Sequence, residues 1–244
     1  MHPRIRLKVC CIASIAEAKM AIAAGADAIG LVARMPSGPG PISDSKIRAV
    51  AASVPPPVAT FLLTCETEPD AVVRHVQETR VNTVQLVDDD VSPDVYIALR
   101  RHVPAVRIVQ VIHVRDRVSV DRAIASSQHV DLLLLDSGNP AASVRELGGT
   151  GRAHDWQLSR EIVVRSPVPV FLAGGLNAGN IAEAVSTVRP FGVDLCSGVR
   201  TNGKLDAEKL RMFVASLTGA IVGAASHGIH DAHQPDGEDG VNLR

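Results

Sequence analysis

Short apolar segments alternate with longer amphipathic ones along most of this chain. The short segments are rich in Val, Ile and Leu, and the longer ones place apolar residues at helical spacing. Strands are predicted at residues 4–10, 28–32, 58–63, 83–86, 107–112, 132–135, 168–172 and 193–196. Helices are predicted at residues 16–24, 43–53, 69–79, 93–102, 119–127, 156–165, 177–188 and 206–217. Each predicted strand is therefore followed by one predicted helix.

This repeated unit predicts a single-domain (β/α)8 TIM barrel. Strands without a clean polar alternation are typical of a parallel sheet that is buried on both faces. A length of 244 residues suits one barrel. An open doubly wound sheet is the alternative, but its glycine-rich loop usually follows the first strand, whereas the glycine turns here follow late strands. We assign residues 1–222 to the barrel and expect residues 223–244, rich in His, Gly, Asp and Gln, to be a disordered tail.

Composition excludes several classes of partner. The net charge is −1 and aromatic residues make up only 2%, so neither a basic stripe nor stacking residues are available for nucleic acid or a membrane surface. No run of about 18 apolar residues predicts a spanning helix. The first residues lack the apolar centre of a signal peptide. The four cysteines have no framework spacing, which favours a reducing compartment. We therefore expect a cytoplasmic protein.

Small-residue turns follow the last three predicted strands. Because consecutive strands of a parallel barrel end on one face, these turns should meet at one rim. Loops after the seventh and eighth strands commonly bind phosphate through backbone N–H groups. Any one of these glycines alone would be explained by a tight turn, but three such turns together favour a phosphate site. Its predicted members are Gly149, Gly151, Gly174, Gly175, Ser197 and Gly198.

Two further residues at predicted strand ends are suited to proton transfer. Asp136 ends a run of four leucines, and partial desolvation there raises a carboxyl pKa and suits it to be a general acid. The alternative is an aspartate that braces the following loop. Cys10 ends the first strand, across the mouth from Asp136, where a thiolate can act as a base. A small buried hydrophobe is the alternative for Cys10, and position alone does not decide between the two.

Several motifs together resemble the phosphoribosylanthranilate isomerase family. The resemblance covers residues 6–217, nearly the whole predicted barrel. Its two most specific parts are the glycine loop that precedes Asp155-Trp156 and the segment Leu172-Ala173-Gly174-Gly175-Leu176-Asn177. The matching motifs are Lys8-Val9-Cys10, Val84-Gln85-Leu86, Leu134-Leu135-Asp136, Gly148-Gly149-Thr150-Gly151, Gly192-Val193-Asp194 and Ser197-Gly198-Val199.

The resemblance implies an enzyme of tryptophan biosynthesis that carries out an Amadori rearrangement of a 5-phosphoribosyl amine. It implies that Cys10 is the general base and Asp136 the general acid. The substrate is then a small phosphorylated sugar amine, and proton transfer alone implies no cofactor. Monomer and homodimer stay open. We expect the substrate pocket to include Lys8, Cys11, Arg34, Gln85, His113 and His154.

The chain departs from the family pattern at several positions. Cys11 stands where the family has glycine after the catalytic cysteine, and strand alternation predicts that only one of Cys10 and Cys11 faces the mouth. The family's Ser-Pro-Arg loop, whose arginine contacts the anthranilate carboxylate, reads Ser37-Gly38-Pro39-Gly40 with Arg34 nearby but unmatched. Its Gln-Leu-His-Gly reads Gln85-Leu86-Val87-Asp88, and Ser-Ser-Gly-Val-Glu reads Cys196-Ser197-Gly198-Val199-Arg200. His154 replaces a phenylalanine. This pattern also fits a paralogue with another aglycone.

Two other classes of function stay open. Cys10, Cys11 and Cys196 come from neighbouring strands of a closed barrel, with His113 and His154 on the same rim, so they suit a zinc site. Against zinc, the sequence has no Cys-x-x-Cys or His-x-x-x-His spacing, and we expect no metal. His113 is either a proton carrier of the pocket or a rim histidine with a structural partner. A phosphate-binding protein without catalysis is the third class, and a retained acid facing a thiol speaks against it.

Overall fold

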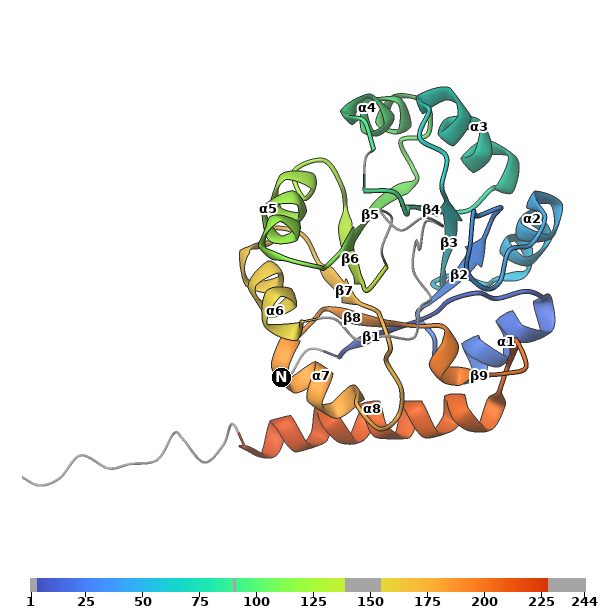
Figure 1. Ribbon diagram of the computed structural model, residues 1–244. Helices are drawn as coiled ribbons and strands as arrows, with labels where there is room; N and C mark the ends of the chain where they lie inside the picture. Colours follow the sequence, from blue (N-terminus) through green and yellow to red (C-terminus); the bar gives the residue numbers. More distant parts are fainter. Residues whose placement is uncertain (1–3, 90, 139–154, 228–244) are drawn as a thin grey trace, which may run out of the picture.

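The computed structural model describes residues 4–89, 91–138 and 155–227. In it, eight parallel strands close into a barrel in the order of the sequence, and helices surround the barrel (Figure 1). The strands are β1 (Arg6–Val9), β2 (Ala28–Val32), β3 (Ala59–Thr64), β4 (Thr83–Leu86), β5 (Arg107–His113), β6 (Leu132–Asp136), β7 (Val170–Leu172) and β8 (Gly192–Leu195). The predicted (β/α)8 barrel is confirmed.

The barrel closes where β1 pairs with β8. Leu7 lies opposite Val193 and Val9 opposite Leu195, both in parallel register. Closure brings the first and last strands of the sequence side by side, so residues 10 and 11 lie next to the end of β8. The Cys10 backbone N–H donates to the carbonyl of Leu195 at 2.7 Å, which continues the ladder one residue beyond the strand.

The helices lie close to their predicted positions. They are α1 (Ile15–Ala23), α2 (Asp44–Ser53), α3 (Pro69–Thr79), α4 (Pro93–His102), α5 (Arg117–Ser126), α6 (Trp156–Arg165), α7 (Ile181–Val188) and α8 (Ala207–His227). The side chains of Ser14, Ser43, Ser92, Asp116 and Asp155 accept hydrogen bonds from first-turn backbone N–H groups. These caps explain why the helices begin where they do.

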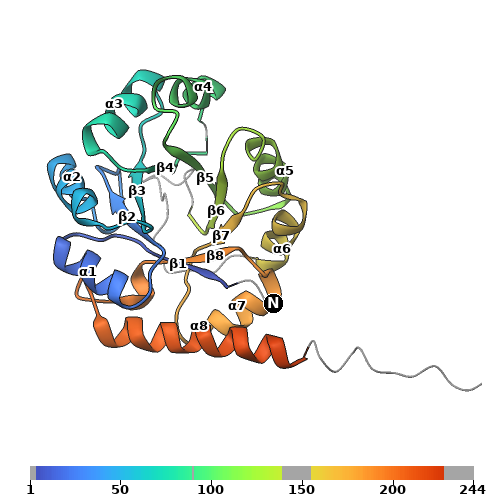
Figure 2. The same ribbon diagram turned by 180° about the vertical axis from the view of Figure 1, so that it is seen from behind.

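The end of the chain differs from expectation. α8 continues to His227, past the predicted boundary at residue 222, and both views show it running alongside α7 (Figures 1 and 2). A short helix η1 (Ser197–Val199) and a hairpin of β9 (Arg200–Thr201) and β10 (Lys204–Leu205) precede it. Two-residue strands carry too little pattern to predict. Residues 228–244 lie outside the described part of the chain.

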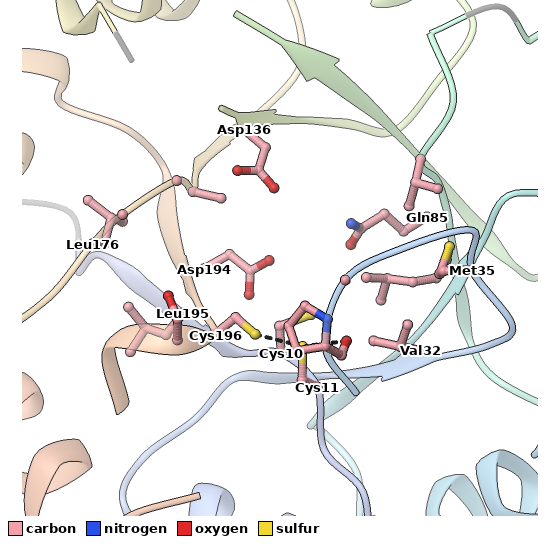
Figure 3. Close-up of a pocket in the computed structure, with 18 of the residues that line it drawn as sticks. Cys10, Cys11, Val32, Met35, Gln85, Asp136, Leu176, Asp194, Leu195 and Cys196 are labelled. Atoms are coloured by element: carbon pink, nitrogen blue, oxygen red, sulfur yellow. Dashed lines mark hydrogen bonds between the residues drawn. The ribbon is translucent and has the colours of Figure 1, made fainter. Parts of the chain in front are cut away.

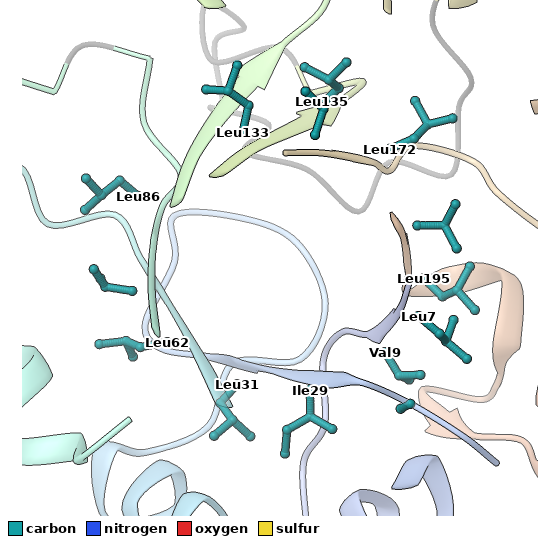
Figure 4. Close-up of a cluster of buried hydrophobic side chains, with 14 of the residues drawn as sticks. Leu7, Val9, Ile29, Leu31, Leu62, Leu86, Leu133, Leu135, Leu172 and Leu195 are labelled. Atoms are coloured by element: carbon teal, nitrogen blue, oxygen red, sulfur yellow. The ribbon is translucent and has the colours of Figure 1, made fainter. Parts of the chain in front are cut away.

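Apolar residues pack on both faces of the barrel wall. Alternate strand residues point outward and form the main core beneath the helices (Figure 4). The opposite set faces the barrel interior and includes Phe61, Val109, Leu134 and Phe171. Both faces are therefore buried, as expected for strands that lack polar alternation. In the described residues no helix is long and apolar enough to cross a membrane.

Candidate active site

A pocket opens at the carboxyl ends of the strands, where the loops converge (Figure 3). Ligands of parallel barrels bind at this end. Residues from the ends of seven strands, all except β5, and from the loop after β2 form its wall. They are Cys10, Cys11, Val32, Met35, Ser37, Gly38, Pro39, Leu63, Gln85, Val87, Asp136, Ala173, Gly174, Gly175, Leu176, Asp194, Leu195, Cys196 and Ser197.

Cys10 and Asp136 lie on opposite sides of this pocket (Figure 3). Asp136 is the last residue of β6 and is half-buried. Its Oδ1 accepts a hydrogen bond from the Ser137 backbone N–H at 2.7 Å, which fixes the carboxylate at the mouth. Cys10 follows β1 directly and is 6% exposed. A carboxyl group and a thiol therefore face the same space from opposite walls.

Both neighbouring thiols line the pocket, so the prediction that only one of them does is wrong. β1 ends at Val9, and Cys11 has a left-handed backbone with φ of 62°. Strand alternation no longer applies once the chain turns in this way. The Cys11 Sγ lies 2.7 Å from the Cys196 Sγ and 3.6 Å from the carbonyl oxygen of Pro39.

A buried ion pair lies beneath Cys10. Lys8 is fully buried, and its Nζ donates to Asp194 Oδ2 at 2.5 Å. Although burial alone would lower it, attraction to Asp194 raises the pKa of Lys8 above its ordinary value. Burial raises the pKa of Asp194 to about 6 despite the ammonium group. Asp194 lines the pocket. Lys8 was predicted to line it but does not; it lies beneath the pocket wall and pairs with Asp194 there.

The surroundings of Cys10 favour its thiolate. A hydrogen bond from the Cys11 side chain lowers the pKa of Cys10; burial opposes this, and the Lys8 ammonium lowers it further. Gly30 leaves room for this arrangement, because a β-carbon there would come within 2.8 Å of Cys10 Sγ and 3.2 Å of Lys8 Nζ. The thiol and the ammonium group thus face the same gap. A thiolate is the form that can accept a proton.

The loops after β7 and β8 pack closely against each other. A β-carbon at Gly198 would lie 2.2 Å from the carbonyl oxygen of Leu176, so only glycine fits there. The Asn180 side chain donates to the carbonyl of Gly175 at 3.0 Å and fixes the loop after β7. Gly174, Gly175 and Ser197 line the pocket, and Gly198 packs behind them. Gly149, Gly151 and His154 lie outside the described residues.

Two buried acceptors of the pocket wall have no hydrogen-bond partner within the described structure. They are the Gln85 Oε1 and the Asp194 Oδ1. Buried polar atoms are rarely left unpaired, so both indicate a ligand with hydrogen-bond donors. Gln85 was predicted from the sequence, whereas Asp194 was not singled out. The signal for Asp194 was a charged residue within an apolar strand that pairs with the strand of Lys8.

His113 and Arg34 do not line the pocket. His113 is fully buried on the inner face of β5, and its Nδ1 pairs with Asp89 Oδ1 at 2.7 Å. Arg115 and Arg122 also contact Asp89, at 3.0 and 2.9 Å. This arrangement matches the alternative of a rim histidine with a structural partner. Arg34 is exposed, while the next residue, Met35, faces the pocket.

The side of the pocket formed by the loop after β2 carries no charged side chain. Met35, Ser37, Gly38 and Pro39 line it, and among the described residues no lysine, arginine or histidine does. In the described part of the chain, no three or more histidine, cysteine or carboxylate side chains are arranged to hold a metal ion.

Comparisons with known proteins agree with this geometry. The profile of the family described as N-(5'phosphoribosyl)anthranilate (PRA) isomerase matches residues 7–216. An N-(5'-phosphoribosyl)anthranilate isomerase of Halobacterium salinarum is 37% identical over 216 residues, which are 87% of this chain and 95% of the relative. The enzyme of Thermotoga maritima superposes with a TM-score of 0.74 at 28% identity, covering 88% of this chain and 99% of that one. The Thermotoga enzyme is described as dimeric.

One similar structure holds a bound ligand. It is a phosphoribosyl anthranilate isomerase in complex with reduced 1-(o-carboxyphenylamino)-1-deoxyribulose 5-phosphate, 26% identical with a TM-score of 0.71 over 88% of this chain and 99% of that one. The profile match spans nearly all of the barrel, and the relative from Halobacterium exceeds 30% identity over most of both chains. This chain belongs to the N-(5'-phosphoribosyl)anthranilate isomerase family.

Proposed function

We propose that this protein converts N-(5'-phosphoribosyl)anthranilate into the corresponding 1-amino-1-deoxyribulose phosphate, an aminoaldose-to-aminoketose isomerisation in tryptophan biosynthesis. The observation that carries the proposal is the placement of Asp136 and Cys10 on opposite walls of one pocket, beside the turns after β7 and β8. Relatives with this activity match nearly the whole chain.

Each proton transfer has a group in place. Asp136 donates a proton to the furanose ring oxygen as the C1′–O4′ bond breaks, and the nitrogen lone pair forms the imine. The Cys10 thiolate then removes the proton from C2′ to give an enolamine. The enolamine gains a proton at C1′ and loses the hydroxyl proton at C2′, which leaves the ketone. The lowered pKa of Cys10 supports its assignment as the base.

The remaining pocket residues have positioning roles in this proposal. Gly174, Gly175 and Ser197 line the pocket on the loops after the last two strands, and we assign phosphate binding to their backbone N–H groups. The unpaired oxygens of Gln85 and Asp194 accept from substrate donors. On the aglycone side, Ser37 and Gly38 stand where the family's Ser-Pro-Arg loop lies. We assign no role to Arg34, because its exposed side chain does not line the pocket.

The test is turnover of freshly made phosphoribosylanthranilate, followed by the loss of its fluorescence. We expect the wild-type protein to be active, and Cys10→Ser and Asp136→Asn each to lose about 10²–10⁴-fold in kcat. Melting temperatures close to that of wild type would show that both variants fold. Because the base must be deprotonated, kcat/KM should rise with pH along a limb that lies below 9.0, the ordinary pKa of the thiol.

Two outcomes would contradict the proposal. A fully active Asp136→Asn protein would exclude this carboxyl as the acid. A wild-type protein that is stabilised by ribose 5-phosphate but does not turn over phosphoribosylanthranilate would show a retained phosphate site with a different substrate. We further propose that the protein is cytoplasmic, has no nucleic-acid partner and acts as a monomer or homodimer. Measurement of its size in solution tests the oligomeric state.

A further inference from the structure

Cys11 and Cys196 form a close pair of thiols at the seam where the barrel closes. Their Sγ atoms lie 2.7 Å apart, and both residues line the pocket beside Cys10 (Figure 3). Neither is in a disulfide. Cys11 is 5% exposed, whereas Cys196 is partly exposed to the pocket. The pair is therefore reachable by a small reagent through Cys196.

Three departures from the family pattern meet at this seam. Cys11 replaces glycine, Cys196 replaces serine and Arg200 replaces glutamate, in the motifs compared above. Arg200 donates from NH2 to the carbonyl oxygens of Cys10 at 3.1 Å and Cys11 at 2.5 Å. Its side chain is 7% exposed and pairs with Glu17 at 3.4 Å. The guanidinium group thus holds the backbone of Cys11 beside β8.

The geometry suits a covalent bond between the two sulfur atoms. A disulfide needs an S–S distance of about 2.05 Å, so the sulfurs must approach by less than about 1 Å. Simple packing of two small hydrophobes would not place the sulfurs this close.

We propose that Cys11 and Cys196 are a modification site, which a low-molecular-weight disulfide such as glutathione disulfide oxidises reversibly to an intramolecular disulfide. The Cys196 thiolate attacks one sulfur of the reagent and releases one glutathione thiolate. Cys11 then attacks the Cys196 sulfur of the mixed disulfide and releases the second glutathione. The Cys11 proton passes to the Cys10 thiolate and then to solvent. Two electrons move from the cysteines to the reagent.

Oxidation would act directly on the base, a consequence that rests on the proposed function. The hydrogen bond from Cys11 is the main cause of the lowered pKa of Cys10. A disulfide removes this donor, because Cys11 no longer carries a hydrogen on sulfur. The pKa of Cys10 then rises, and less thiolate is present near neutral pH. Turnover should therefore fall on oxidation and return on reduction.

The experiment treats the full-length protein with glutathione disulfide, blocks the remaining thiols by alkylation and maps peptides by mass spectrometry. We expect the peptide with Cys11 to be linked to the peptide with Cys196. Because Cys10 and Cys11 share a tryptic peptide, Cys11→Ser identifies the partner and should abolish the link. Cys65→Ser is the matched control and should keep the link, since the Cys65 Sγ contacts the carbonyl of Arg34 in another loop.

Turnover is measured on the same samples. We expect oxidised wild type to lose at least about tenfold in kcat/KM and to recover with dithiothreitol, while the oxidised-to-reduced rate ratio of Cys196→Ser stays near one. A link that persists in Cys11→Ser, or no link in wild type, overturns the site. A linked wild type with unchanged turnover overturns the effect on Cys10. Because the link is read by mass, a linked protein without isomerase activity would contradict only the proposed function.

Discussion

Cys11 and Gly40 share one small space beside the base. Cys11 has a left-handed backbone, which costs a non-glycine residue about 1–2 kcal/mol. Gly40 has a φ of 87°, and a β-carbon there would come within 2.7 Å of the Cys11 Cβ and 3.2 Å of its Sγ. The side chain at position 11 therefore restricts position 40 to glycine. Two departures from the family pattern are therefore coupled: the glycine-containing loop after β2 and the cysteine in place of glycine after β1.

This coupling can be measured with a double-mutant cycle. In the wild-type background Gly40→Ala should lower the free energy of unfolding by about 2–4 kcal/mol, because it adds a steric clash to an unfavourable φ. In a Cys11→Gly background the same change should cost at least about 1 kcal/mol less, because two of the three close atoms are gone. Urea denaturation of the four proteins provides the values. Equal costs in both backgrounds would show that the two residues do not interact.

Asp194 was quoted from the sequence only as part of a family motif and was not predicted as a site residue. It lies inside an apolar strand, and its partner Lys8 is 186 residues away. Their pairing depends on closure of β8 onto β1, which local pattern does not report. Cys11 lines the pocket as predicted, but strand alternation had allowed only one of Cys10 and Cys11 to do so. Alternation predicts side-chain direction only while the backbone is extended, and a left-handed residue at the strand end breaks it.

At the scale of elements, the turns after β7 and β8 form one unit. Gly198 in η1 packs against the backbone of Leu176, so the position of each loop depends on the other. The apolar runs predicted the strands that lead into these loops, and the glycines predicted the turns. Neither signal predicted the hairpin of β9 and β10, because its strands have two residues each. Nor did the sequence show that Gly198 packs behind the pocket while Ser197 lines it.

Gly198→Ala should separate these two loops. A β-carbon 2.2 Å from the Leu176 oxygen forces the backbone to move, and shifts of about 1 Å can cost 10²-fold in activity. We expect KM for the phosphorylated substrate to rise at least about tenfold and protection against thermal unfolding by inorganic phosphate to weaken. Steady-state kinetics and melting curves with and without phosphate measure both effects.

Gly219→Ala is the matched control for that variant. Gly219 lies in α8, and a β-carbon there would meet nothing within 4 Å. Alanine within a helix should raise the free energy of unfolding by about 0.5–1 kcal/mol and leave KM unchanged. A Gly198→Ala protein that behaves like Gly219→Ala in both assays would exclude the turn after β8 from phosphate binding.

At the scale of the whole molecule, the barrel depends on α8 as well as on its strands. The helix begins where Asp206 Oδ1 accepts from the backbone N–H groups of Glu208 and Lys209, at 3.0 and 3.1 Å. Phe213 is fully buried and Leu217 is 5% exposed, so this helix buries apolar surface where it packs beside α7 and η1. The family profile ends at residue 216, within the same helix. The part of α8 that the barrel requires should therefore end soon after Leu217.

Truncation tests this division of the chain. A protein ending at residue 227 should keep the melting temperature and turnover of the full chain, because the described elements of the barrel all lie before residue 228. A protein ending at residue 211 loses Phe213 and Leu217 from the core and should be destabilised by at least about 3–5 kcal/mol. Calorimetry and the isomerase assay on both proteins compare the two cuts. If the chain ending at residue 227 lost turnover but kept its melting temperature, residues 228–244 would belong to the active site rather than to a dispensable tail.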